Sequence, residues 1–187
     1  RPYLLQGCYP TSFTVMSDDG KYSRDARHVY YCGILLADAD PDTFQILAPP
    51  YSKDANHAYA GAVAFEVLDA STFEVIRPGD SEFPLINSSG ELKQREFIKP
   101  RTSIWGWARD SQACYYANKR IPNADRDTFE VLNFCYAKDK DKVYYAGSRS
   151  VSVVAGADLA SFVADPSIEI QASDKNGDFL KGKRVPN

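Results

Sequence analysis

The sequence lacks the features that mark membrane-spanning and nucleic-acid-binding proteins. Its longest candidate apolar run, Val151 to Ala157, contains a glycine and falls far short of the roughly 18 residues that a membrane helix needs. Its 22 basic and 25 acidic residues give a formal net charge of -3, so no basic excess is available to attract nucleic acid. We therefore expect no transmembrane segment and no nucleic-acid partner.

Familiar catalytic motifs are missing as well. The sequence has no Gly-x-Ser-x-Gly nucleophile motif, no phosphate-binding glycine loop and no Cys-x-x-Cys pair that would suit zinc. These absences predict a protein that is not an enzyme and that carries no metal and no cofactor.

Cysteine is scarce, but its number is even, which fits a compartment where disulfides form. Pairing of neighbours along the chain predicts the bridges Cys8–Cys32 and Cys114–Cys135. Other connectivities remain open, and buried thiols in a cytosolic protein are the alternative. The chain begins with Arg1 rather than methionine, as expected of a processed or trimmed chain. We expect a periplasmic or secreted protein.

What the sequence does contain is an internal repeat of two blocks. The first block reads aromatic, small, basic, aspartate, and a tyrosine follows five residues after the aspartate. The second block reads Asp-x-x-Thr/Ser-Phe, and its phenylalanine comes 19 residues after the first aspartate in three copies and 23 residues after it in the fourth. The aspartates are Asp25, Asp54, Asp110 and Asp139, the tyrosines are Tyr30, Tyr59, Tyr115 and Tyr144, and the phenylalanines are Phe44, Phe73, Phe129 and Phe162.

The spacing of the copies defines the units. Asp25 and Asp54 are 29 residues apart, as are Asp110 and Asp139, whereas Asp54 and Asp110 are 56 apart. We therefore expect one domain over residues 1–187, with partial units at both ends, as repeat arrays require. The expected units are about 20–48, 49–76, 107–133 and 134–165, with a degenerate unit or an insertion at 77–106 and partial end units at 1–19 and 166–187.

Each unit predicts a small group of short strands. Tyr136-Ala-Lys-Asp139 and Val143-Tyr-Tyr145 flank a polar turn and have the composition of a β-hairpin. Asp40 followed by Pro41 is typical of a capped helical turn, and the alternation in Phe44-Gln-Ile46 indicates another strand. The predicted fold is all-β: a repetitive antiparallel meander of short strands with single capped helical turns, either closed like a propeller or left as an open, curved sheet.

The recurring polar residues predict architecture more readily than chemistry. Catalysis needs one unusual environment, so aspartates that recur in every unit are better explained as turn formers. His28 and His57 share one repeat position that lysine or alanine takes elsewhere, which indicates a tolerant turn site. Calcium is an alternative for Asp38–Asp42 and Asp139–Asp141, but the first lacks the glutamate of an EF-hand loop and the second alternates with lysines.

The tyrosines leave two interpretations. They form either a core ladder whose hydroxyls bond to nearby backbone, or an exposed aromatic stripe that uses the second tyrosine of each pair, since neighbouring residues of a strand point to opposite faces.

These blocks resemble the bacterial DKNYY repeat family. The resemblance rests on Tyr136-Ala-Lys-Asp-Lys-Asp-Lys-Val-Tyr-Tyr145, on Ala39-Asp-Pro-Asp-Thr-Phe44 and on the turn Ser173-Asp-Lys-Asn176. It covers about residues 20–76 and 107–164 well, and it implies an envelope or secreted protein with a binding or immunity-type role.

From these observations we expect a non-enzymatic protein-binding protein of the bacterial envelope, most concretely an immunity protein that blocks a toxin enzyme. A carbohydrate-binding module or glycan-acting enzyme is the first alternative, because exposed aromatics stack on sugars and paired carboxylates can cleave glycosidic bonds. A purely structural envelope repeat protein is the second. The candidate contacts with a protein partner lie in the segment without repeat counterpart, because aromatic and arginine side chains dominate binding hot spots; they are Phe83, Arg95, Phe97, Arg101 and Trp105.

Overall fold

The computed structural model describes residues 8–77, 106–147 and 150–186. Within these ranges the chain forms twenty strands and one 3-10 turn, η1 (Pro10–Ser12), and no α-helix. The strands make five antiparallel sheets of four strands each, and in every sheet neighbours along the chain are also neighbours in space. The prediction of an all-β meander is thus confirmed.

The five sheets follow one another along the chain and are numbered here from the N-terminus. Sheet 1 comprises β1 (Thr14–Val15), β2 (Tyr22–Arg24), β3 (Val29–Tyr31) and β4 (Ile34–Leu35). Sheet 2 comprises β5 (Gln45–Ile46), β6 (Tyr51–Lys53), β7 (Ala58–Ala60) and β8 (Val63–Phe65). Sheet 3 comprises β9 (Glu74–Arg77), β10 (Trp107–Arg109), β11 (Cys114–Tyr116) and β12 (Lys119–Arg120). Sheet 4 comprises β13 (Glu130–Val131), β14 (Tyr136–Lys138), β15 (Val143–Ala146) and β16 (Val151–Val153). Sheet 5 comprises β17 (Val163–Ala164), β18 (Gln171–Asp174), β19 (Gly177–Leu180) and β20 (Lys183–Arg184).

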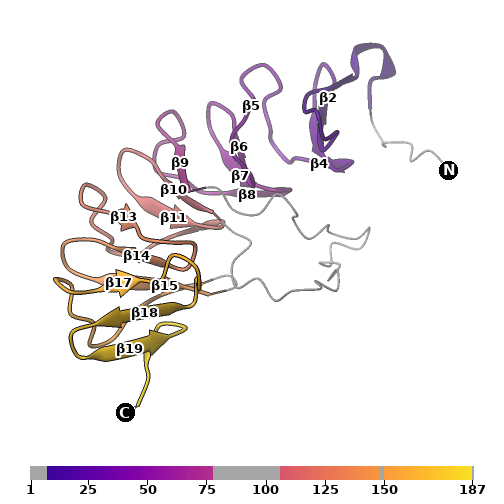
Figure 1. The fold of residues 1–187 in the computed structure, drawn as a ribbon. Helices are drawn as coiled ribbons and strands as arrows, with labels where there is room; N and C mark the ends of the chain where they lie inside the picture. Colours follow the sequence, from indigo (N-terminus) through magenta and orange to yellow (C-terminus); the bar gives the residue numbers. More distant parts are fainter. Residues whose placement is uncertain (1–7, 78–105, 148–149, 187) are drawn as a thin grey trace.

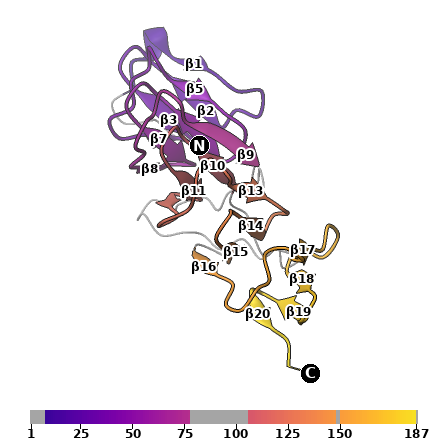
Figure 2. The same cartoon turned by 90° about the vertical axis from the view of Figure 1, so that its left-hand side faces the viewer.

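The sheets stack in a curved row, with sheet 1 at one end and sheet 5 at the other (Figure 1). The view turned by 90° shows the same order of sheets from the N-terminal to the C-terminal end (Figure 2). The described residues do not form a closed propeller, because the two ends of the row lie apart. They do not form a single open, curved sheet either, because the strands are divided among five separate sheets.

The expected degenerate unit at 77–106 falls almost wholly outside the described residues. Its two flanks are described: β9 ends at Arg77, β10 begins at Trp107, and these two residues pair in an antiparallel register. The intervening segment therefore connects two adjacent strands of a single sheet.

Sequence explains why the central strands form and where they turn. The Val-Tyr-Tyr type of strand has high β propensity, and β2 and β3 pair Tyr22 with Tyr31 in register. The two-residue loop that leads into β4 has positive φ at Cys32 (49°) and Gly33 (79°), the combination that a type I′ hairpin turn requires.

The core lies between the sheets as a ladder of aromatic rings. The phenylalanine of each Asp-x-x-Thr/Ser-Phe block inserts between a ring of the preceding sheet and a ring of its own sheet, with centroids 5.4–5.9 Å away. Each buried phenylalanine contributes about 1.5–3 kcal/mol by leaving water. The four sets are Tyr22–Phe44–Tyr59, Tyr51–Phe73–Tyr115, Trp107–Phe129–Tyr144 and Tyr136–Phe162–Phe179.

Of the two interpretations of the tyrosines, the core ladder is confirmed. The second tyrosines expected to form an exposed stripe are mostly buried: Tyr31 is 6% exposed, Tyr116 is 1% exposed, and Tyr145 is half-buried. The idea of an exposed stripe was wrong because each of these tyrosines packs into the core cluster between its own sheet and a neighbouring sheet.

No helix among the described residues has the length and apolar character needed to cross a membrane.

The predicted disulfides are absent: the structure has neither Cys8–Cys32 nor Cys114–Cys135. Cys8 lies beside the turn that contacts Asp25 at one end of β3, whereas Cys32 follows the other end of that strand. Cys114 and Cys135 are both buried, but they belong to separate core clusters. Proximity along the chain therefore misleads here, because the partners sit at opposite ends of a strand or in different layers.

Candidate functional site

The repeated aspartate is the most connected polar group of each unit. In sheet 4, Asp139 follows β14 and is 4% exposed. Its Oδ1 accepts the backbone N–H groups of Asp141 (2.8 Å) and Lys142 (2.7 Å), which shapes the hairpin turn. Its Oδ2 accepts the backbone N–H of Asp125 (2.9 Å) and the hydroxyl of Tyr144 (2.6 Å). One carboxylate thus joins the hairpin turn, the core tyrosine and the capped turn that precedes the sheet.

The same arrangement recurs in the other units with different residues around it. Each aspartate accepts two turn amides, one tyrosine hydroxyl and an amide of the turn that precedes its sheet, and Asp110 also accepts a second amide of that turn, from Leu68. The sets are Asp25 with Arg27, His28, Tyr9 and Tyr30; Asp54 with Asn56, His57, Asp40 and Tyr59; and Asp110 with Gln112, Ala113, Asp69 and Tyr115. The predicted turn role of these aspartates is confirmed, while their bond to the tyrosine replaces the expected tyrosine-to-backbone bond.

A hydroxyl group adds a second connection between the two turns. Asp125 caps its own turn by accepting the backbone N–H (3.0 Å) and the hydroxyl (2.8 Å) of Thr128. The Thr128 hydroxyl in turn accepts the backbone N–H of Lys140, one residue after the motif aspartate, at 3.0 Å. Equivalent bonds join Ser12 to Ala26, Thr43 to Ala55, Thr72 to Ser111 and Ser161 to Lys175.

These contacts set the ionisation of both partners. Burial raises the pKa of Asp139, but the bond from the Tyr144 hydroxyl and then those from backbone amides outweigh it, so the pKa lies below its usual value. The same balance lowers the pKa of Asp25, Asp54 and Asp110. These carboxylates are ionised at neutral pH and fully occupied as acceptors, so they are poorly suited to donate a proton in catalysis.

In sheet 5 an arginine, rather than a tyrosine, donates to the motif aspartate, Asp174. Phe179 stands where the other sheets have the hydroxyl-bearing tyrosine. Arg184 replaces that hydroxyl: its Nη1 lies 3.0 Å from Asp174 Oδ1, its Nη2 lies 2.9 Å from Oδ2, and its guanidinium lies 4.4 Å from the centre of the Phe179 ring. A forked arginine matches a carboxylate in two places at once, which explains how the unit keeps its aspartate without the tyrosine.

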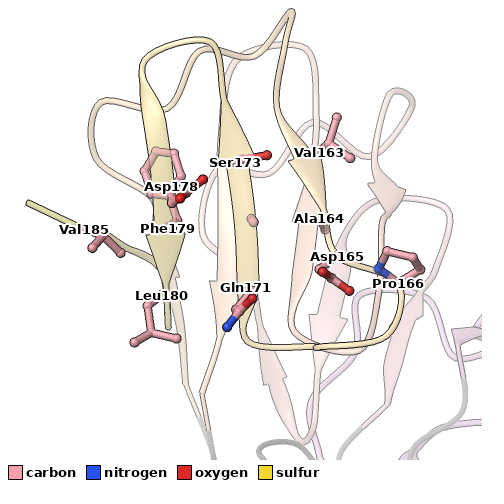
Figure 3. A pocket seen from close by; sticks show the side chains of 11 residues that line it. Val163, Ala164, Asp165, Pro166, Gln171, Ser173, Asp178, Phe179, Leu180 and Val185 are labelled. Carbon is pink, nitrogen blue, oxygen red and sulfur yellow. The ribbon is translucent and has the colours of Figure 1, made fainter. Parts of the chain in front are cut away.

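The outer face of sheet 5 has no neighbouring sheet, and its side chains differ accordingly (Figure 3). Gln171 and Ser173 take the places that Tyr136 and Lys138 hold in sheet 4, and Leu180 takes the place of Tyr145. The face is hollowed by a concavity of about 420 Å³. Smaller or more polar side chains at these positions suit an end unit, because this face meets water rather than another aromatic layer.

A second concavity, of about 280 Å³, lies between sheets 1 and 2 and is called the sheet 1–2 groove below. Its floor carries Tyr22 and Tyr31, which are 7% and 6% exposed. Burial raises the pKa of Tyr22 to about 12, an effect that the adjacent Ser52 hydroxyl partly opposes. Ser52 itself is fully buried, and its Oγ has no hydrogen-bond partner among the described residues. The walls come from the turn before β2, from the end of β5 and from the turn before β6: Ser17, Asp18, Asp19, Lys21, Ile46, Leu47, Pro49 and Pro50.

Other predicted positions divide into those described and those not. His28 and His57 each place Nδ1 within 3.3–3.4 Å of their motif aspartate, as turn residues do. The stretches that suggested calcium do not gather into a cluster of metal ligands in the described part of the chain. Phe83, Arg95, Phe97, Arg101 and Trp105 lie outside the described residues, so their role in binding stays a prediction.

Comparison with known proteins gives one match. The model of the DKNYY family matches residues 6–63 and 107–185, which together make up most of the chain. Neither curated proteins nor solved structures contain a match to the chain.

Proposed function

The chain belongs to the DKNYY family, and we propose that it is a non-enzymatic scaffold that binds a protein partner. The repeated polar residues support this proposal because their hydrogen-bonding capacity is used within the array. What remains for a partner is the surface of the row of sheets, and extended surfaces of this kind are what repeat proteins use for recognition.

The observation that carries the proposal is a pair of exposed apolar side chains on sheets 1 and 2, one of which lines the sheet 1–2 groove. Val15 on β1 is 62% exposed and Ile46 on β5 is 37% exposed. Both lie on the first strand of their sheet, and Ile46 also forms a wall of the groove. Exposed apolar side chains next to a concavity are typical of protein interaction sites.

We place this role in the bacterial envelope, with a toxin enzyme as the partner that the scaffold blocks. The family resemblance is what favours such an immunity role. The envelope location is part of the proposal. Disulfides do not support it, because none of the four cysteines forms a disulfide in the structure.

The test is affinity capture from an envelope extract with the full chain as bait. The expected result is recovery of one partner by the wild-type protein and by the matched control Val153→Asp, which changes a valine of sheet 4 whose exposure, 54%, lies between those of Val15 and Ile46. Val15→Asp and Ile46→Asp should each lose most of it. The recovered protein should be an enzyme that equimolar wild-type chain inhibits. Failure to recover a partner, or equal recovery by all variants, would overturn the proposal.

Sugar binding receives less support from the described residues. It requires exposed aromatic rings, and among the described residues Tyr9 is the large aromatic residue left exposed, at 40%. The ring of Tyr9 is partly occupied, because the Arg27 guanidinium lies 4.8 Å from its centre.

A further inference from the structure

The sheet 1–2 groove differs from the corresponding places between the other sheets. At each of the other three interfaces, the first aromatic residue of the repeat block donates a hydrogen bond to a backbone carbonyl of the next sheet's first turn. The pairs are Tyr51 hydroxyl to Gly106 O, Trp107 Nε1 to Phe134 O at 3.0 Å, and Tyr136 hydroxyl to Ile170 O at 3.1 Å. Tyr22 holds this position between sheets 1 and 2, and no backbone carbonyl of the described residues accepts its hydroxyl.

The interface between sheets 3 and 4 shows which group fills such a place. Phe134 belongs to the first turn of sheet 4 and is half-buried. Its carbonyl accepts the Trp107 indole, and its ring packs 4.2 Å from the guanidinium of Arg77 in sheet 3. Phe134 thus supplies both the carbonyl that accepts the Trp107 indole N–H and an apolar ring at the interface between sheets 3 and 4.

The turn of sheet 2 does not supply an equivalent residue. It runs from Leu47 to Pro50, and neither proline has a ring that reaches across as Phe134 does, so the space stays open at about 280 Å³. That volume lies below the about 300–1,000 Å³ of sites for drug-sized ligands and suits a single side chain with its peptide group. Tyr22 and Tyr31 lie at the floor of the groove, and Ile46 and Leu47 form an apolar wall.

We propose that the sheet 1–2 groove binds one aromatic residue of a partner polypeptide, with a backbone carbonyl of that residue accepting a hydrogen bond from the Tyr22 hydroxyl. This inference rests on the proposed protein-binding function and names where and how the partner would be held. The exposed side chains of Val15 and Ile46 extend the contact beyond the groove.

The probe is N-acetyl-phenylalanine amide, with N-acetyl-alanine amide as its control, titrated into the ¹⁵N-labelled full chain. A ligand of this size is expected to bind at about millimolar concentration. Amide shifts should concentrate on the two turns that form the walls, around Lys21 and Leu47, and the alanine compound should not produce them. Shifts spread evenly over the array, or equal shifts with both compounds, would refute the proposal.

Two matched variants separate binding from folding. Tyr22→Phe removes a hydroxyl that bonds to no backbone carbonyl, so it should weaken probe binding about five- to tenfold and leave the unfolding midpoint nearly unchanged. Tyr136→Phe, at the same repeat position, breaks the bond to Ile170 O, so it should lower the unfolding midpoint and leave probe binding unchanged. Unchanged binding by Tyr22→Phe would contradict the assigned donor.

The outcomes also distinguish this site from the wider function. If the probe fails to bind while a partner is still captured through Val15 and Ile46, the groove is excluded and the binding function stands. If the probe binds but no partner is captured, the groove is a real site and the proposed function falls.

Discussion

Replacing Asp139 by alanine is expected to lower the free energy of unfolding by about 3–5 kcal/mol. The change removes the acceptor of four hydrogen bonds: three backbone amides and the hydroxyl of Tyr144. Each donor left without a partner costs about 1–3 kcal/mol when water cannot reach it. The turn amides are near the surface and regain part of that loss from water, whereas the Tyr144 hydroxyl is buried, so the total falls near the lower end of the sum.

Urea denaturation of the full chain, followed by tryptophan fluorescence, measures this cost, because Trp107 is fully buried in the adjoining sheet. Asp127→Ala is the matched control: its side chain is 87% exposed, so its effect should stay within about 0.5 kcal/mol. Tyr144→Phe should cost about 1–2 kcal/mol. The double variant of Asp139 and Tyr144 should cost less than the sum of the single changes, since both remove the same bond.

Two results would refute this reasoning. Equal stabilities of Asp139→Ala and Asp127→Ala would show that the buried carboxylate does not hold the unit together. Strict additivity of the Asp139 and Tyr144 changes would show that the 2.6 Å bond between them has no energetic weight.

Three further predictions follow from the same contacts. Gly182→Ala should be more destabilising than Gly156→Ala by about 1–3 kcal/mol in denaturation experiments. Both glycines have φ +72°, but only at Gly182 would an added Cβ lie 2.6 Å from Tyr145 Cβ. Equal losses of stability would contradict the close packing of Gly182 against Tyr145. Phe129→Ala should lower the free energy of unfolding by about 3–5 kcal/mol. Phe13→Ala should lower it clearly less, because Phe13 is half-buried and has one ring neighbour where Phe129 has two. The reverse order would contradict the stabilising role of the aromatic ladder. Stability should be constant down to about pH 4 and then fall, because the lowered aspartate pKa values stabilise the fold above the unfolded pKa and lose that effect as pH drops toward the folded ones; a thermal melting series that changes near pH 6 instead would argue against these groups.

Much of the fold was predictable because the repeat places the same side chains in the same surroundings. The 19-residue spacing from Asp25 to Phe44 implies a constant unit, and the aspartate–proline pair at Asp40 indicates a capped turn. Both features depend on local chain geometry, which sequence specifies well.

The connections between turns were not predictable in the same way. The bond from the Asp40 amide to Asp54 joins residues 14 apart, and periodicity does not reveal which amide reaches which oxygen. The exchange of a tyrosine for Phe179 and Arg184 was missed because the compensating arginine is ten residues from Asp174. The curvature of the row and the sheet 1–2 groove depend on how neighbouring turns fit, which is a property of packing rather than of any one block.

Residue-resolved amide hydrogen exchange tests the central claim most directly, namely that a buried carboxylate ties each hairpin to the turn before its sheet. In all five sheets an amide at the start of that turn donates to the carboxylate; these amides are Tyr9, Asp40, Asp69, Asp125 and Asp158. The account predicts that all five exchange slowly and that Asp139→Ala frees the Asp125 amide far more than the other four. Exchange of these amides at the rate of exposed loop residues in the wild-type protein would contradict it.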